Sequence, residues 1–486
     1  MLAAKKQRIE FGDFQTPDTL AVQVCALLRR LGISPDEIVE PTCGVGAFVV
    51  AAASEFREAK AIFGYEINES YLDELRLKLD TLHAPQRVVL EAADFFATDW
   101  KQRAVSREQT TLVLGNFPWV TSSTLGAIGG ANAPEKSNFM GFNGFDAVTG
   151  KANFDISEWM LLEVVRWFSG RSGDIAMLVK TAVARKVLAQ LERRKEPVQQ
   201  AYMFGIDAKK SFGAAVDACL LVVRLNPQQP ANYDYTAFKN LDDPCGRRVG
   251  HRLGMSVGDL QAFEKSAFLL GKSPEKWRSG IKHDASGVME FTRTDGGYEN
   301  GFGEVVELED AYLFPLLKGS DIGSDKKWRE KFVLVTQRHV GESTDAIHAR
   351  APKTWAYLEA HATQLDARGS IVYEKNPRFS IFGVGDYAFR PWRIAICALY
   401  KALNFRLIGP MGGDVVMFDD TVYYLSFDTE KEAVSALKSI RSSASIGLLS
   451  SLIFWDEKRP IKTGVLNLLD WSRLQQSDEI RQAELI

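Results

Sequence analysis

The regular alternation of strand-like and helix-like segments over residues 17–225 is the feature that most limits the fold. Short apolar runs typical of buried strands occur at 38–41, 61–67, 88–96, 111–117, 174–180 and 217–225. Helical patterns lie among them at 17–32, 47–57, 69–80 and 155–168. Strands that alternate with helices of this length predict a parallel sheet with helices on both faces. The first half of the chain is therefore expected to adopt an α/β fold.

The rest of the chain predicts a second domain. With 486 residues, the chain exceeds the size that one hydrophobic core usually serves. The polar, proline-bearing segment NPQQPANYD at 226–234 interrupts the alternation, aromatic residues and short strands follow, and the tail at 428–486 is helical in pattern. We predict a catalytic domain at 1–225, a linker at 226–244 and a second domain at 245–486.

Composition excludes several classes of protein. Hydrophobic residues make up 46% and charged residues 25% of the chain, as in ordinary globular proteins. No apolar run approaches the roughly 18 residues of a membrane span, and the amino-terminal residues lack the apolar core of a signal peptide. The five cysteines and six histidines are scattered, which predicts neither a disulfide framework nor a metal site. We expect a cytoplasmic protein without membrane contact.

The distribution of charge is more informative than the net charge of −3. Residues 11–170 are acidic, whereas 171–282 carry an excess of about eight positive charges. The basic residues of this stretch include Arg193, Arg194, Lys195, Lys209, Lys210, Arg247, Arg248 and Arg252. Two interpretations remain open, a solvated helix face and a flank that contacts phosphates.

The segment from Glu40 to Phe48 combines a strand that ends in an acidic residue, a glycine turn and the start of a helix. This arrangement brings backbone close to a ligand at the carboxyl ends of the strands. The GxxxxGK[ST] pattern of a phosphate loop is absent. Glu40, Thr42, Gly44 and Gly46 are therefore candidates for binding a ligand that is not held by a phosphate loop.

The next three strands also end in polar or aromatic residues. Glu66 and Ile67 end one strand, and an acidic residue at this distance from a glycine turn commonly accepts hydrogen bonds from ribose hydroxyls. Asp94 and Phe95 end another strand, where a carboxylate beside an aromatic ring could hold an adenine. The fourth strand ends in the tetrapeptide Asn116-Phe117-Pro118-Trp119. Since parallel strands end at one edge of a sheet, these residues predict a single site.

The series of motifs resembles that of gamma-class N6-adenine-specific DNA methyltransferases of type II restriction-modification systems. Phe14-Gln15-Thr16-Pro17 resembles the FxxTP motif, and Asn116–Trp119 resembles the (N/D/S)PP(Y/F/W) motif. Residues 314–321 and 368–389 resemble the recognition domains of type II adenine methyltransferases. The resemblance implies a Rossmann-like, seven-stranded methyltransferase domain, followed by a mixed α/β target-recognition domain with a helical tail.

The resemblance also implies S-adenosylmethionine as cofactor and a role for each candidate. Thr16 would bind the methionine carboxylate, Glu40 and Thr42 the amino-acid end, and the backbone of the Gly44–Gly46 turn would line the pocket. The ribose would be bound by Glu66, with Ile67 beside it. The cofactor adenine would be bound by Asp94 and Phe95. No metal is implied.

The expected chemistry centres on the amino group of a target adenine, whose lone pair is conjugated into the ring. The side-chain oxygen of Asn116 and the backbone carbonyl of Phe117 would accept its two N–H bonds, while Trp119 and Phe212 would stack on the base. The family has proline at the position of Phe117. Because the second acceptor is a backbone carbonyl and Pro118 still favours an extended residue 117, we expect the mechanism to be intact.

The implied partner is double-stranded DNA, from which the target base must be flipped. Candidates for DNA contact in the second domain are Arg338, Arg368, Lys375, Asn376 and Arg378. The long segment 120–151 is expected to face DNA or to enclose the base. A separate cognate restriction endonuclease and a monomeric state are further expectations.

Two alternatives remain. A methyltransferase that acts on RNA or on a protein glutamine also uses an NPPY-like motif, but the long second half, which resembles DNA-recognition domains, argues against it. A catalytically silent DNA-recognition subunit of a defence complex is the other alternative. The presence of Thr16, Glu66, Asp94 and Asn116 argues against this second alternative.

Overall fold

The computed structural model describes residues 15–82, 84–100, 109–120, 155–324 and 328–474. The chain divides into two compact units, Met1–Ser256 and Val257–Ile486. Each unit has its own sheets, and each is described by itself.

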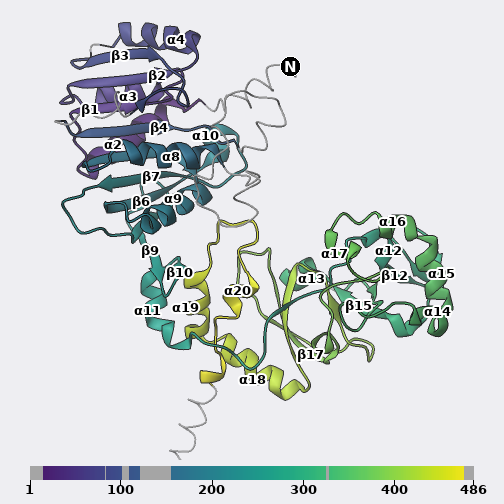
Figure 1. Ribbon diagram of the computed structural model, residues 1–486. Coiled ribbons are helices and arrows are strands. Elements are labelled where there is room, and N and C mark those ends of the chain that lie inside the picture. Colours follow the sequence, from purple (N-terminus) through teal and green to yellow (C-terminus); the bar gives the residue numbers. More distant parts are fainter. Residues whose placement is uncertain (1–14, 83, 101–108, 121–154, 325–327, 475–486) are drawn as a thin grey trace, which may run out of the picture. The chain divides into compact units, whose positions relative to one another are not determined.

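The first unit is built on one large sheet (Figure 1), with strands in the order β10-β9-β8-β6-β7-β5-β4-β1-β2-β3. The strands are β1 (Glu37–Glu40), β2 (Ala61–Glu66), β3 (Arg87–Ala92), β4 (Thr111–Asn116), β5 (Gly173–Lys180), β6 (Val198–Ile206), β7 (Ala218–Leu225), β8 (Tyr235–Phe238), β9 (Arg247–Arg252) and β10 (Met255–Val257). Strands β3, β2, β1, β4 and β5 pair in parallel, and β7 is antiparallel to both β5 and β6. The first seven strands thus form the predicted Rossmann-like methyltransferase sheet, and the α/β fold class is confirmed.

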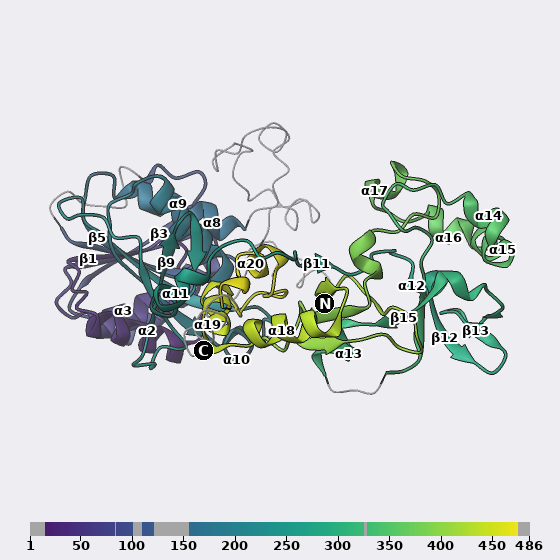
Figure 2. The same cartoon turned by 90° about the horizontal axis from the view of Figure 1, so that it is seen from below.

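Helices cover both faces of this sheet, as the alternation predicted. The helices are α2 (Asp18–Arg30), α3 (Ala47–Glu55), α4 (Glu69–Asp80), α8 (Ile156–Trp167), α9 (Thr181–Arg193) and α10 (Ala208–Phe212). Figure 2 shows α2 and α3 on one face of the sheet and α8 and α9 on the other. In α2, the side chains of Leu20, Val24 and Leu28 recur at a spacing of four residues and are buried. Each such burial stabilises the fold by about 1.5–3 kcal/mol.

The sheet extends further along the chain than the sequence patterns indicated. Helix α9 and strand β6 lie in a stretch for which no element was predicted, and β8 lies within the segment 226–244 that was predicted to be a linker. Strand β8 pairs in parallel with β6, and the rings of Phe204 and Phe238 stack at a centroid distance of 4.5 Å. The functional division into catalytic domain, linker and recognition domain stays a prediction.

The second unit has mixed α/β structure with two sheets. The four-stranded sheet contains β11 (Arg278–Ser279), β20 (Val422–Phe427), β17 (Trp392–Cys397) and β18 (Arg406–Ile408). The six-stranded sheet contains β14 (Val305–Val306), β13 (Gly297–Glu299), β12 (Glu290–Thr294), β16 (Lys331–Leu334), β15 (Leu313–Leu317) and β19 (Met417–Phe418). The motif at 314–321 covers β15 and the first turn of the next helix.

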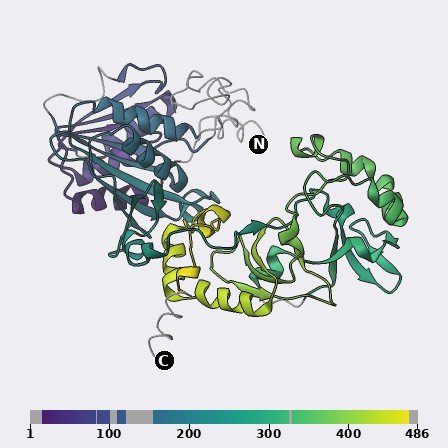
Figure 3. The same ribbon diagram turned by 60° about the horizontal axis from the view of Figure 1, so that its bottom comes forward.

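Short helices complete the second unit. They are α11 (Leu260–Ser266), α12 (Ser286–Met289), α13 (Gly319–Gly323), α14 (Ala346–Arg350), α15 (Pro352–Ala360), α16 (Ala362–Asp366) and α17 (Ile371–Glu374). The carboxy-terminal part contains α18 (Glu430–Ile440), α19 (Ser443–Leu452) and α20 (Thr463–Leu466), drawn in yellow in Figure 3. The tail predicted to be helical therefore contains helices. Within the described residues, no helix combines the length and the apolar character that a membrane span requires.

Candidate active site

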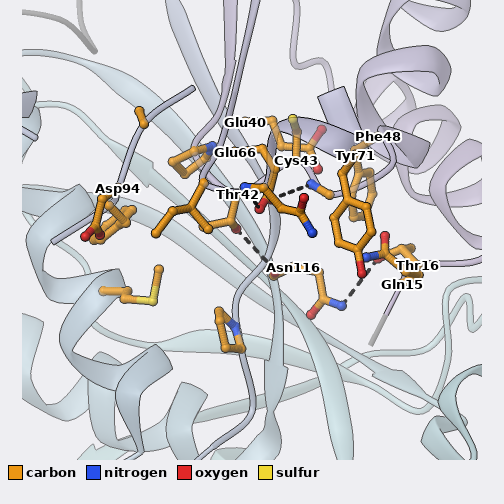
Figure 4. Close-up of a pocket in the computed structure, with 18 of the residues that line it drawn as sticks. Gln15, Thr16, Glu40, Thr42, Cys43, Phe48, Glu66, Tyr71, Asp94 and Asn116 are labelled. Carbon is orange, nitrogen blue, oxygen red and sulfur yellow. Dashed lines mark hydrogen bonds between the residues drawn. The ribbon is translucent and has the colours of Figure 1, made fainter. Parts of the chain in front are cut away.

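A pocket opens at the carboxyl ends of β1, β2, β3 and β4 in the first unit (Figure 4). Its lining contains Gln15, Thr16, Glu40, Pro41, Thr42, Cys43, Gly44, Ala47, Phe48, Glu66, Ile67, Asn68, Tyr71, Ala93, Asp94, Phe95, Phe96, Asn116, Pro118 and Met160. Its volume, open mouth included, is about 920 Å³, within the range of pockets that hold small-molecule ligands and cofactors. The four strand ends that the sequence singled out therefore do meet at one site.

The turn between β1 and α3 requires glycine at two positions. Gly44 and Gly46 have φ of +52° and +83°, a region that other residues rarely adopt. A Cβ atom on Gly46 would lie 2.1 Å from Cδ1 of Leu75, and one on Gly44 would lie 2.6 Å from Oε1 of Gln15. The backbone can therefore approach its neighbours closely only because these side chains are missing, and this shapes one wall of the pocket.

Glu66 is held in place by backbone donors. The N–H of Gly44 donates to its Oε2 at 2.9 Å, and the N–H of Asn68 donates to its Oε1 at 3.0 Å (Figure 4). A carboxylate has about four acceptor positions. These two bonds fix the orientation of the Glu66 carboxylate at the edge of the pocket.

Glu40 is a buried carboxyl group in the wall of the pocket. Glu40 is 3% exposed, and its Oε2 has no hydrogen-bond partner among the described residues. Burial raises the pKa of Glu40 well above its ordinary value, a backbone hydrogen bond from Val49 opposes this, and the nearby charge of Glu66 adds to it. A cationic group of a ligand would satisfy this carboxyl, because a buried acidic group is stabilised by an opposite charge.

Asp94 and Phe95 lie at the β3 side of the pocket. Oδ1 of Asp94 accepts from the N–H of Phe96 at 2.9 Å, and Phe95 is 5% exposed. The ring of Phe95 lies 5.3 Å from that of Trp100 and 5.8 Å from that of Trp167. This packing fixes the aromatic wall of the pocket.

Asn116, at the end of β4, is joined to two other motifs. Its Nδ2 donates to the hydroxyl oxygen of Thr16 at 3.3 Å, and its backbone carbonyl accepts from the hydroxyl of Thr42 at 3.5 Å (Figure 4). The end of β4 is thus tied both to the segment before α2 and to the glycine turn.

Phe117 stands where the resembled family has proline, and its side chain does not line the pocket. It is 1% exposed, and its ring meets Phe95 edge to face at 5.5 Å. The added aromatic ring therefore packs into the core, so the departure from the family motif takes no space from the pocket.

Trp119 and Phe212 lie together beside the pocket. The indole Nε1 of Trp119 donates to the carbonyl of Leu178 at 3.3 Å, and its ring meets Phe212 edge to face at 4.9 Å. Phe212 ends α10 and is half-buried. The structure thus brings together two aromatic residues that are far apart in sequence, while their role in stacking on a base stays a prediction.

The predicted site residues thus fall into two groups. Those that line the pocket are Thr16, Glu40, Thr42, Gly44, Glu66, Ile67, Asp94, Phe95, Asn116 and Pro118. Gly46, Phe117, Trp119 and Phe212 are not part of the lining formed by the described residues. The individual roles of all these residues stay predictions. Phe14 and the segment 121–154 lie outside the described residues.

Sequence reasoning missed several residues of the pocket. Gln15 accepts from the N–H of Val45 at 3.2 Å, and Asn68 caps α4 through a bond from the N–H of Ser70. Tyr71 and Met160 reach the pocket from α4 and α8. The first turn of the helix that follows each strand end was the available signal for Asn68 and Tyr71, whereas nothing local marks Met160.

One candidate for DNA contact is buried in the second unit. Arg368 is 9% exposed, its guanidinium donates to three backbone carbonyls within the second unit, and it lies 3.9 Å from the ring centroid of Tyr373. The burial of Arg368 and its bonds to backbone carbonyls inside the fold argue against the prediction that it contacts DNA.

The other candidates of the second unit differ in their surroundings. Arg378 pairs with Asp366 at 2.7 Å, and Asn376 donates to the carbonyl of Val372. Lys375 is exposed, as is Arg338, which lies over the ring of Phe389 at 4.1 Å. These four residues stay candidates.

Parts of the basic stretch are also explained. Arg248 and Arg252 both pair with Asp234, at 2.9 and 2.8 Å. Lys209 and Lys210, on α10, are exposed and form no ion pair within the described parts of the chain. The two lysines stand within three residues of Phe212 and are the members of the stretch nearest in sequence to the candidate site.

Comparison with known proteins places this geometry in a family. No family model matches the chain. The chain is 46% identical over 468 residues to the Type II methyltransferase M.NspV of Nostoc sp. The match covers 96% of this chain and 97% of that protein. Among solved structures, the fold is similar to that of the Type IIL restriction-modification enzyme MmeI in complex with DNA, with a TM-score of 0.51 and 12% identity.

The match with the MmeI structure covers 94% of this chain, which spans only 65% of the length of that protein, and it bears on the fold alone. The match with M.NspV extends over nearly the whole of both chains. The chain therefore belongs to the type II methyltransferases, enzymes that use S-adenosylmethionine as cofactor.

Proposed function

We propose that the protein transfers a methyl group from S-adenosylmethionine to the exocyclic N6 amine of an adenine that is flipped out of double-stranded DNA. The observation that carries the proposal is the position of Asn116. It lies at the end of β4, on the pocket, and bonds to Thr16 at 3.3 Å. An amide at this position can bind a substrate amine beside a cofactor held by the neighbouring strand ends.

The pocket fits the cofactor chemically. S-adenosylmethionine supplies a methyl group on a positively charged sulfur, and it also carries an ammonium group. The buried carboxyl of Glu40, whose Oε2 has no partner among the described residues, suits the cationic amino-acid end. The oriented carboxylate of Glu66 suits the ribose hydroxyls, and Asp94 with Phe95 suits the purine.

Asn116 and Phe117 would prepare the substrate amine. The lone pair of the adenine N6 is delocalised into the ring, so the amine is a weak nucleophile. Two acceptors aimed at its two N–H bonds favour a pyramidal nitrogen, whose lone pair can form the new N–C bond as the methyl–sulfur bond breaks and its electron pair returns to sulfur. Because Nδ2 of Asn116 is engaged by Thr16, the amide orientation is set and Oδ1 serves as one acceptor. The carbonyl of Phe117 serves as the other, and the amine releases a proton to water.

The target base must leave the duplex to reach this site. The pair formed by Trp119 and Phe212 supports the proposal because aromatic rings hold extruded bases by stacking, and Trp119 follows Asn116 by three residues in the chain. The second unit would supply phosphate contacts and base reading. A separate restriction endonuclease would cleave the same site when it is unmethylated.

Identification of the methylated nucleoside tests the proposal. The protein is incubated with labelled S-adenosylmethionine and genomic DNA from a host that lacks DNA methylation, and the digested nucleosides are analysed by mass spectrometry. The proposal predicts N6-methyladenine. Label in N4-methylcytosine would instead assign cytosine as the target base. In parallel reactions with cellular RNA or protein in place of DNA, label confined to those substrates would support the alternative methyltransferases, and absence of transfer to any substrate would support the silent subunit.

A further inference from the structure

Lys180 connects the catalytic tetrapeptide to a neighbouring helix. It is the last residue of β5, the strand beside β4, and follows Leu178, which pairs with Asn116, by two residues. Its Nζ donates to the backbone carbonyl of Trp119 at 2.9 Å and to Oδ2 of Asp155 at 2.6 Å. The side chains of Lys180 and Asp155 are 22% and 8% exposed, so the ion pair is largely shielded from water.

The two carboxylate oxygens of Asp155 have separate tasks. Oδ1 caps α8, accepting from the backbone N–H of Ser157 at 3.2 Å and from its hydroxyl at 2.5 Å. Oδ2 receives Lys180. In addition, the N–H of Ile156 donates to the carbonyl of Val120 at 3.0 Å. Two links therefore connect the start of α8 to the end of the tetrapeptide and the residue after it. One is the backbone hydrogen bond between Ile156 and Val120, and the other is the charged bridge through Lys180.

Trp119 is held from both sides by β5. Its indole donates to the carbonyl of Leu178, and its own carbonyl accepts from Lys180. A charge-assisted bond at this carbonyl limits rotation of the peptide unit that follows Trp119. Asn116 is fixed in β4 and the carbonyl of Trp119 is fixed by Lys180. Phe117 and Pro118 lie between these two fixed residues, so the position of the Phe117 carbonyl is restrained from both sides along the chain.

We propose that Lys180 is a positioning residue for methyl transfer: through the carbonyl of Trp119 and the carboxylate of Asp155, it holds the two amine acceptors and the Trp119 ring in register. The inference rests on the proposed function. Lys180 acts through other groups, so its loss should lower the rate of methyl transfer. The affinity for the cofactor should not change, because the cofactor is bound by residues at other strand ends.

Kinetics of the full-length Lys180→Met protein provide the test, with unmethylated genomic DNA and S-adenosylmethionine at saturation. Misplacement of a reacting group by about 1 Å can cost about 100-fold in rate, so kcat should fall by at least about tenfold. The dissociation constant of S-adenosylmethionine, measured by calorimetry, should change by less than about twofold. Lys180→Arg keeps a cationic donor and should restore most of the rate.

Asp155→Asn keeps one side-chain oxygen, which can still cap α8, but it removes the Oδ2 acceptor of Lys180, whose bond to the carbonyl of Trp119 remains. Its kcat should fall less than that of Lys180→Met. The double variant Lys180→Met/Asp155→Asn removes the buried carboxylate that the single variant leaves unpaired. It is therefore the measurement to use if the single variant does not fold.

Lys60→Met is the matched control. Lys60 comes directly before β2, at the end of that strand opposite to the pocket, pairs with Asp36 at 2.9 Å and has a side chain that is 62% exposed, so its loss should leave kcat unchanged. Wild-type kcat in a folded Lys180→Met protein would overturn the inference, as would a loss of cofactor affinity equal to the loss of rate. Absence of methylation by the wild-type protein would instead contradict the proposed function.

Discussion

The side-chain Nδ2 of Asn116 donates a hydrogen bond to the hydroxyl oxygen of Thr16 at 3.3 Å, although the two residues are 100 positions apart in the chain. Thr16 comes just before α2, and Asn116 ends β4. This bond joins a residue predicted to bind the cofactor to the residue predicted to accept the substrate amine. It implies that changes at Thr16 affect both binding and rate.

Thr16→Val keeps the shape of the side chain but removes the hydroxyl. We predict that kcat falls by about fivefold, because the Asn116 amide loses the partner that orients it, worth on the order of 1 kcal/mol. The dissociation constant of S-adenosylmethionine should rise at the same time. Thr16→Ser, which keeps the hydroxyl, should stay near wild type in both. Equal kcat for the valine variant and the wild-type protein in steady-state methylation assays would show that Asn116 is oriented without Thr16.

Glu40→Gln should change how stability depends on pH. The pKa of Glu40 is raised by burial, so the folded state binds its proton more tightly than the unfolded state. Protonation of Glu40 therefore stabilises the folded state. This contribution is fully present below the pKa of about 4.5 that Glu40 has in the unfolded chain, and it is lost as pH rises through the higher pKa of the folded state. Without cofactor, the variant should therefore melt at a higher temperature than wild type at about pH 8 and at a similar temperature at about pH 4.

The same variant should bind S-adenosylmethionine more weakly, because a neutral amide cannot balance the cationic end of the cofactor. Thermal melting across pH, with and without cofactor, checks both parts. Melting curves of the two proteins that shift in parallel with pH would mean that folding does not raise the pKa of Glu40.

How far the sequence predicted this site depends on whether each signal is local. The ends of β1, β2, β3 and β4 could be read directly, because a strand and the turn after it occupy adjacent residues. The same reasoning could have found Lys180, which ends a strand that was predicted at 174–180, but no role was assigned to it. Its function depends on Asp155 and Trp119, which fold against it from other elements.

Other features depended on contacts that the sequence does not show. Strand β6 contains polar residues and a bulge between Val198 and Gln200, so its apolar pattern is weak. It is a strand because it pairs with β7 along nearly its whole length. Arg368 was a candidate for DNA contact within the segment 368–389, which resembles recognition domains. Its carbonyl acceptors at His283, Leu365 and Ser380 become neighbours only in the folded unit.

Lys209→Gln/Lys210→Gln tests whether the basic stretch contacts DNA. Both lysines are exposed on α10, which ends at Phe212. If each neutralises one phosphate next to the flipped base, the double variant should bind duplex DNA more weakly. The slope of log K against log salt should become shallower by about 2. Arg57→Gln is the control, because Arg57 is exposed beyond the carboxyl end of α3, away from the turn that shapes the pocket. A salt slope equal to that of wild type would assign the two lysines to a solvated helix face.

The central claim is that Asn116 accepts the amine of an adenine in DNA, and the most direct measurement is the single-turnover rate of Asn116→Ala on unmethylated genomic DNA. We expect a loss of at least about 100-fold in the formation of N6-methyladenine, as for the removal of other groups that act in the transition state. The affinity for S-adenosylmethionine should change little, and Asn116→Asp, which keeps an acceptor oxygen and belongs to the same motif, should retain part of the rate. Formation of N6-methyladenine by Asn116→Ala at a rate near that of the wild-type protein would contradict the account.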